Sequence, residues 1–108
     1  VDDMAEASLF VLDLPREHYE ANTQPMLSHI NVGFGEDISI LELAQLVAKI
    51  TGFEGRIATD PSKPDGTRRK LMDVSRLSEM GWKPRIDLEQ GLEETYRWYL
   101  EHAETARL

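Results

Sequence analysis

Apolar residues recur at helical spacing within the first dozen positions of the chain and predict a helix there. Asp2 or Asp3 can cap this helix, and Pro15 ends it. Glu6 is placed to close a capping box around Asp3. Val1 stands directly before the cap, where a native start normally brings a methionine and a ragged lead, so we expect the chain to be a fragment of a longer protein.

Two further long helices are predicted from capping signals. Ser39 forms a Ser-x-x-Glu capping box with Glu42 ahead of a periodic apolar run, and Gly52 suits the left-handed position after its last turn. Asp87 caps a final helix, and a short helix is predicted after Asp73. The apolar positions of the final helix are expected on one face: Leu88, Leu92, Tyr96 and Tyr99, thickened by Trp98 and Leu100.

Two short segments are rich in β-prone residues. We expect residues 28–32 to form a buried strand that stops at Gly33-Phe34-Gly35, and residues 55–59 to form a second strand. Residues 16–27 are typical of a connection, and residues 61–70 of a turn-rich loop. The pattern therefore predicts an α/β fold with three main helices and short strands.

The composition is that of one globular domain or part of one, with 108 residues of which 41% are hydrophobic and 30% charged. A net charge of -8 argues against general nucleic-acid binding, because neutralising phosphates needs a broad basic surface. The sequence contains no cysteine, which excludes a disulfide scaffold and agrees with a reducing cytoplasm. No apolar run approaches the ~20 residues that span a bilayer. We therefore expect a cytoplasmic protein without nucleic-acid or membrane partners.

Several residues that often carry chemistry have simpler structural explanations here. His18, His29 and His102 lie far apart and lack metal-ligand spacing, so no metal site is expected. Acidic pairs such as Glu36-Asp37 lie at helix entries or on solvent faces, so no catalytic residue is assigned. Gly33-Phe34-Gly35 lacks the third glycine of a dinucleotide loop, and the acids after it would repel a pyrophosphate.

The loop from Pro61 to Lys70 concentrates four cations around one carboxylate in an otherwise acidic chain. Lysine and arginine can hold a diphosphate, and Asp65 can accept hydrogen bonds from ribose hydroxyls or base N–H groups. Pro64 and Gly66 fix a bend that would present Asp65. A solvated turn whose bases offset neighbouring acids explains the same composition, so the residues alone leave both interpretations open.

Several segments taken together resemble a known family. In order, they are residues 1–5, 29–33, 39–43, 63–67, 69–71 and 73–77, and the pairs Gly81-Trp82 and Gly91-Leu92. Their order and spacing resemble the C-terminal third of the extended short-chain dehydrogenases/reductases, whose parent fold is a Rossmann-type NAD(P)-binding fold. Lys-Pro-Asp-Gly-Thr followed by Arg-Lys-Leu, together with residues 22–29, resembles the GDP-L-fucose synthases in particular. The match covers essentially all 108 residues.

The resemblance implies an NADP(H)-dependent enzyme that epimerises GDP-4-keto-6-deoxy-D-mannose at C3 and C5 and then reduces C4. In the family, the glycine-rich cofactor loop, the Ser-Tyr-Lys catalytic set and the epimerisation Cys and His would all precede Val1. Residues 1–108 are therefore expected to be a substrate-binding region that lacks the Rossmann cofactor domain and is inactive alone. The full-length enzyme would bind a GDP-sugar and NADP(H) and form a homodimer.

The position-by-position match implies two substrate-binding residues. Asp65 matches a substrate-contacting aspartate of the family, and Lys70 matches a lysine that helps to hold the GDP moiety. The family usually has proline where this chain has Arg68, and the loss of a fixed φ adds freedom to the loop. No role is assigned to the guanidinium of Arg68.

Two alternatives differ in function. The first is a freestanding α/β module that binds a partner through Trp82, Tyr96 and Trp98, although aromatic residues at helical spacing more often belong to a core. The second is the C-terminal part of another nucleotide-sugar epimerase or dehydratase of the same superfamily, which would keep the fold and change the substrate.

Overall fold

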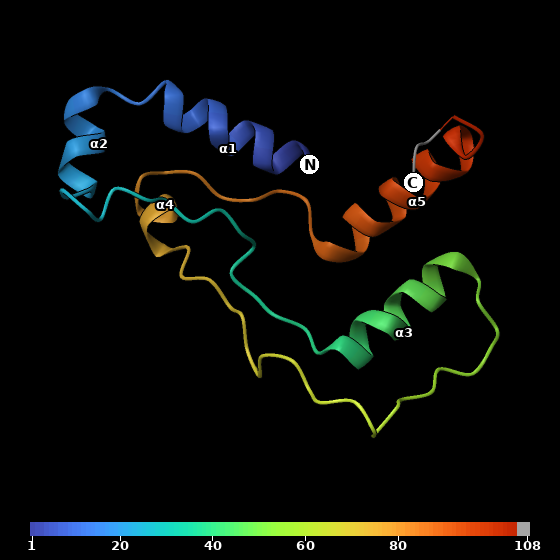
Figure 1. The fold of residues 1–108 in the computed structure, drawn as a ribbon. Coiled ribbons are helices and arrows are strands. Elements are labelled where there is room, and N and C mark those ends of the chain that lie inside the picture. The colour runs from blue at the N-terminus through green and yellow to red at the C-terminus, as the bar shows by residue number, and fades with distance from the viewer. Residues whose placement is uncertain (106–108) are drawn as a thin grey trace. The chain divides into compact units, whose positions relative to one another are not determined.

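The computed structural model describes residues 1–105, which form five helices (Figure 1). The described chain divides into two compact units. Unit 1 comprises Val1–Asp37 and Arg69–Arg85. Unit 2 comprises Ile38–Arg68 and the described part of the chain from Ile86 onward. The helices are α1 (Asp2–Leu12), α2 (Arg16–Asn22), α3 (Ile40–Thr51), α4 (Ser75–Glu79) and α5 (Leu88–His102).

The two expected strands are wrong, whereas the three main helices are present as α1, α3 and α5. Residues 28–32 and 55–59 are irregular, and the β-type pairing described within residues 1–105 is one isolated bridge, between Gln24 and Leu27. A strand needs hydrogen bonds to a neighbouring backbone, and around residues 28–32 the described hydrogen bonds involve side chains instead. The Arg76 guanidinium donates to the carbonyl oxygens of Leu27 and His29, and the Asn31 amide donates to the carbonyl oxygen of Asp73 over 3.0 Å.

Helix α2 lies where the sequence pattern predicts only a connection. Pro15 is its N-cap, and the carbonyl oxygen of Pro15 accepts hydrogen bonds from the N–H groups of His18 and Tyr19. Arg16 and Glu20 form an i, i+4 ion pair along its surface, with 2.7 Å between Nε and Oε1. Proline is well suited to the start of a helix, because the first turn needs no N–H donor there.

The capping signals are confirmed for α3 and α5. The Ser39 hydroxyl accepts the N–H of Glu42 over 3.1 Å while the Glu42 carboxylate accepts the N–H of Ser39 over 3.0 Å. Hydrogen bonding of the Glu42 carboxylate to the Ser39 side chain, followed by its bond from the Ser39 N–H, holds the pKa of Glu42 below its usual value. Gly52 closes α3 in the left-handed conformation at φ 69°, and the Asp87 carboxylate accepts the N–H of Gln90 at the start of α5.

The predicted cap of α1 is wrong. Val1 is the N-cap, and Asp3 lies inside the helix, where its side chain makes no capping bond. Oδ2 of Asp3 instead accepts the backbone N–H of Arg85 over 2.9 Å. The Asp3 side chain therefore binds a backbone group 82 residues further along the chain and does not cap its own helix.

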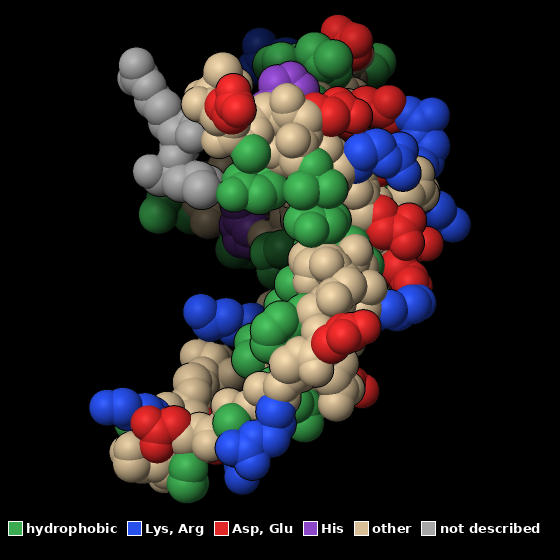
Figure 2. Space-filling model, turned by 90° about the vertical axis from the view of Figure 1, so that its right-hand side faces the viewer, with side chains coloured by type: hydrophobic (Ala, Val, Ile, Leu, Met, Phe, Trp, Pro, Cys, Tyr) green, Lys and Arg blue, Asp and Glu red, His purple; other side chains and the backbone are tan. Residues whose placement is uncertain are grey.

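Among residues 1–105 the buried side chains are few, and they lie in unit 1: Ala7, Leu77 and Met80. Leu77 on α4 is the largest fully buried side chain, with 1% of its surface exposed. In unit 2, α3 and α5 lie side by side without burying any described residue completely (Figure 1). Trp98 and Leu100, which are expected to thicken the apolar stripe of α5, remain 54% and 59% exposed. Hydrophobic side chains accordingly reach the surface at several places in Figure 2.

We expect Ser39→Ala to lower the free energy of unfolding by about 1 kcal/mol, because the mutation removes the acceptor for the Glu42 N–H. Ser8→Ala is the matched control, since Ser8 lies inside α1 and its hydroxyl only donates back to the Met4 carbonyl oxygen. Urea unfolding of both variants measures the difference. If the Ser39→Ala variant were as stable as the Ser8→Ala variant, the capping box would contribute nothing to the stability of α3.

Candidate functional site

The loop of residues 61–70, called the basic loop below, begins with a turn that the Asp60 and Ser62 side chains stabilise. Oδ1 of Asp60 accepts hydrogen bonds from the Ser62 hydroxyl over 2.6 Å and from the Ser62 N–H over 3.0 Å. The bond from the Ser62 hydroxyl, followed by that from its N–H, holds the pKa of Asp60 below its usual value. The N–H of Lys63 donates to the Asp60 carbonyl oxygen over 3.2 Å, so the chain enters the loop in a defined turn.

The other end of the loop is held by an ion pair between Arg69 and Asp37. Nε of Arg69 lies 2.6 Å from Oδ2 of Asp37, and Nη2 lies 3.4 Å from Oδ1, so the guanidinium meets both carboxylate oxygens. This hydrogen bond and the negative charge of Asp37 raise the pKa of Arg69 above its usual value. The Arg69 guanidinium is therefore already occupied by a carboxylate.

Asp65 and Lys70, the two residues implied by the resemblance, are exposed and make no hydrogen bond or ion pair with any residue from 1 to 105. Asp65 belongs to unit 2 and Lys70 to unit 1, and no described interaction joins them. The structure therefore leaves both charges available to solvent or ligand. A lysine can bind phosphate as a point charge, and a carboxylate can accept hydrogen bonds from hydroxyl or N–H groups.

Gly33 and Gly35 leave room for neighbouring side chains of unit 1. A Cβ on Gly33 would lie 3.2 Å from Cε of Met72 and 3.3 Å from Cγ1 of Val74, and a Cβ on Gly35 would lie 3.1 Å from Cγ2 of Val74. The space that these glycines leave open is filled by side chains, and the acid that follows, Asp37, is paired with Arg69. These residues do not fit the phosphate cradle of a dinucleotide.

Two arginines organise unit 1 in ways that sequence reasoning missed. Arg85 pairs through Nη2 with the Glu6 carboxylate, and this bond raises the pKa of Arg85. Arg76 donates to two carbonyl groups of the segment before Asn31. The partners are 79 and 47 to 49 residues away in sequence, so no local spacing could have indicated these contacts.

The histidines bring no metal site together, since no group of three potential ligands occurs within the described part of the chain. His102 stacks on Trp98 with ring centroids 4.7 Å apart, and its Nδ1 lies 2.8 Å from the Trp98 carbonyl oxygen. His29 takes part through its backbone carbonyl, which accepts from Arg76.

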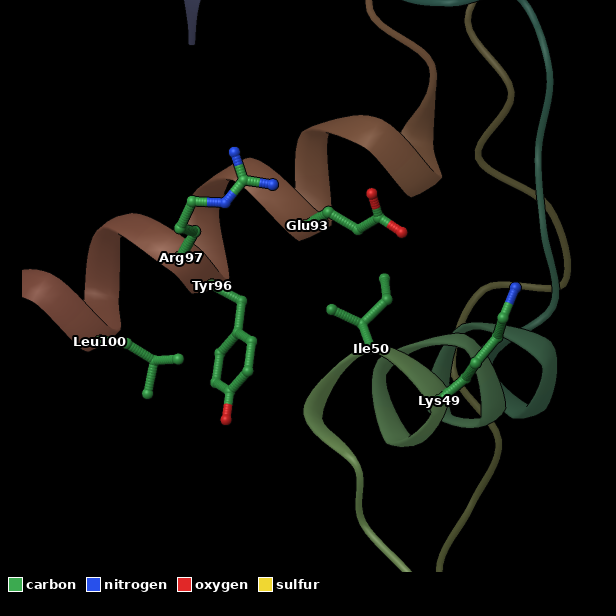
Figure 3. A pocket seen from close by; sticks show the side chains of 6 residues that line it. All are labelled: Lys49, Ile50, Glu93, Tyr96, Arg97 and Leu100. Carbon is green, nitrogen blue, oxygen red and sulfur yellow. The ribbon is translucent and has the colours of Figure 1, made fainter.

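Each unit also contains an open cavity. In unit 1, a cavity of about 290 Å³ lies beside α4 and is lined in part by Phe34, Leu77 and Trp82. In unit 2, a cavity of about 380 Å³ lies between α3 and α5, and Figure 3 shows Ile50 facing Tyr96 and Leu100 across it. None of the residues that line these two cavities belongs to the Lys63 to Lys70 loop.

No family model matches the chain. In sequence, it is 57% identical over 107 residues to GDP-L-fucose synthase from Escherichia coli (strain K12), a match that covers 99% of this chain and 33% of that protein. It is 50% identical over 107 residues to probable GDP-L-fucose synthase 1 from Oryza sativa subsp. japonica, covering 99% of this chain and 30% of that protein.

The resemblance to the GDP-L-fucose synthases is confirmed. The chain spans about a third of the length of these relatives. None of the helices within residues 1–105 has the length and apolar content that a bilayer span requires.

Solved structures of GDP-sugar enzymes share the fold. A GDP-6-OMe-4-keto-L-xylo-heptose reductase from Campylobacter jejuni is 36% identical with a TM-score of 0.75, covering 94% of this chain and 29% of that one. A GDP-D-glycero-L-gluco-heptose synthase from the same organism, solved in the presence of NADPH, is 32% identical with a TM-score of 0.77, covering 92% of this chain and 28% of that one. The helical architecture is therefore similar to a segment of each of these two GDP-sugar enzymes.

Proposed function

We propose that this chain is the C-terminal, substrate-binding part of a GDP-L-fucose synthase, which converts GDP-4-keto-6-deoxy-D-mannose to GDP-L-fucose by C3/C5 epimerisation and C4 reduction. The observation that carries the proposal is the 57% identity to the Escherichia coli enzyme over 99% of this chain. An α/β module of independent function is not favoured, because sequence relatives and structural neighbours alike are GDP-sugar enzymes.

In this proposal the Lys63 to Lys70 loop contacts the nucleotide end of the substrate. Lys70 supplies a positive charge for the diphosphate, and Asp65 accepts hydrogen bonds from hydroxyl or base N–H groups. Both side chains are exposed and without a protein partner among the described residues, which supports a role toward a ligand. Arg69 donates through Nε and Nη2 to Asp37, so Lys70 rather than Arg69 is assigned to the phosphate.

The reaction chemistry is proposed to lie outside this chain. NADP(H) would supply the hydride for C4 reduction, and the residues described here do not fit a dinucleotide, since Gly33 and Gly35 face the side chains of Met72 and Val74. The contribution of this chain is to bind and orient the GDP-sugar, which raises the effective concentration of the sugar ring at the catalytic groups. The full-length enzyme is proposed to be a cytoplasmic homodimer.

A second candidate is a reductase of another GDP-linked sugar, because the solved structural neighbours include GDP-heptose enzymes. Their identities of 32% and 36% are lower than the 57% shared with a GDP-L-fucose synthase. The nucleotide is GDP in both candidates, so the two differ in the sugar alone.

We expect the full-length protein to oxidise NADPH when supplied with GDP-4-keto-6-deoxy-D-mannose and to release GDP-L-fucose. The 108-residue chain should show no turnover under the same conditions, because the proposed catalytic groups are outside it. NADPH absorbance and chromatography of the sugar product measure both reactions. Turnover by the 108-residue chain would contradict the assignment of the chemistry to the rest of the enzyme. A full-length protein that accepts only a GDP-heptose substrate would favour the second candidate.

A further inference from the structure

Asp37 and Arg69 occupy related places in the path of the chain. The chain leaves unit 1 immediately after Asp37, runs through Ile38–Arg68 of unit 2, and returns to unit 1 at Arg69. The last residue before this excursion is therefore paired directly with the first residue after it. The ion pair therefore joins the point where the chain leaves unit 1 to the point where it returns.

The geometry distinguishes this pair from an incidental surface contact. Arg69 presents Nε and Nη2 to the two carboxylate oxygens of Asp37, at 2.6 Å and 3.4 Å, and the two residues are 32 positions apart. The ion pair on α2, between Arg16 and Glu20, is of a different kind, because it joins neighbours on one helix turn through a single nitrogen. A two-point contact fixes the orientation of a guanidinium as well as its distance.

The charge pattern around Arg69 gives this pair a second consequence. Arg68, Arg69 and Lys70 are three consecutive cations, and Asp37 neutralises the middle one. Lys70 follows directly, with its Cα about 3.8 Å from that of Arg69. Holding Arg69 thus restricts the backbone from which Lys70 projects, and it directs Nε and Nη2 of Arg69 toward Asp37.

We propose that Asp37 is a positioning residue for substrate binding, which acts by holding Arg69 and thereby placing Lys70. The inference rests on the proposed function, since it assigns a role within the same GDP-sugar site. Asp37 itself touches no substrate in this proposal. Its contribution is to reduce the freedom that the loop must lose when the ligand binds.

The test uses the full-length enzyme with Asp37→Asn, Arg69→Gln and the exchanged double variant Asp37→Arg/Arg69→Asp. Each single variant should raise KM for the GDP-sugar about threefold with kcat nearly unchanged. An increase of this size corresponds to the loss of the free energy that one exposed but well-oriented ion pair contributes. The exchanged double variant should recover most of the loss, because it restores an ion pair of reversed polarity. Glu20→Gln, which removes the pair on α2, is the matched control and should leave KM unchanged.

Amide hydrogen exchange of residues 69–72 provides a readout that needs no substrate. Faster exchange there in Asp37→Asn, and recovery in the double variant, supports the hold on Arg69. Unchanged exchange, or a raised KM that the double variant fails to recover, would overturn the positioning role. A wild-type enzyme without GDP-sugar turnover would instead refute the proposed function, and the exchange measurement would still decide whether Asp37 holds Arg69.

Discussion

Replacing Lys70 by alanine in the full-length enzyme is expected to raise KM for the GDP-sugar by roughly tenfold to a hundredfold, the range for losing hydrogen bonds to a charged group. Lys70 is exposed and makes no ion pair within the described residues, so its removal should disturb the fold little. If Lys70 binds the diphosphate equally in the ground state and the transition state, kcat should stay close to wild type. Steady-state kinetics with varied GDP-sugar measures both constants.

Arg56→Ala is the matched control for Lys70→Ala. Arg56 is an exposed cation outside the basic loop, without a hydrogen bond or ion pair among residues 1–105. Its loss changes the net charge of the chain by the same amount, so a general electrostatic effect on an anionic substrate would appear in both variants. Equal increases in KM would contradict a specific role of Lys70, and a fall in kcat alone would contradict uniform binding.

Leu77→Ala should be the most destabilising of the substitutions considered, lowering the free energy of unfolding by about 2–5 kcal/mol. Leu77 is 1% exposed and is the largest fully buried side chain of the described chain, in a unit whose other buried residues are Ala7 and Met80. With so few buried side chains, little remains to compensate for the cavity. Urea unfolding of the 108-residue chain, with hydrogen exchange of residues 69–85, measures the loss.

Leu12→Ala tests whether this effect depends on burial. Leu12 is the last residue of α1 and is 79% exposed, so the same deletion should change stability by less than about 0.5 kcal/mol. Similar losses in the two variants would mean that Leu77 does not anchor unit 1. The stability of the chain would then come from contacts other than those around α4.

The elements that could be predicted are those whose signals are local. Ser39, Glu42, Gly52 and Asp87 lie within four residues of the groups that they cap, and the helices α3 and α5 form as their pattern indicates. The strands at residues 28–32 and 55–59 could not be judged this way, because a strand depends on a partner that the same segment does not contain.

For the candidate site, the basic loop and its two residues, Asp65 and Lys70, come from composition and family resemblance. Their role as ligand contacts stays a prediction. The structure contributed the partner of Arg69, which composition could not supply, since Asp37 lies 32 positions away and has the local appearance of a residue at a helix entry.

The sequence by itself determined the long helices, the basic loop and the relationship to GDP-L-fucose synthases, because periodicity, caps and motifs are properties of neighbouring residues. Only the tertiary structure decided which charges in and around the loop are free. Arg69 is bound to Asp37, and Lys70 makes no described contact, although the two cations are adjacent in the chain. The physical reason is that an ion pair requires proximity in space, and the fold brings one carboxylate to one of these cations.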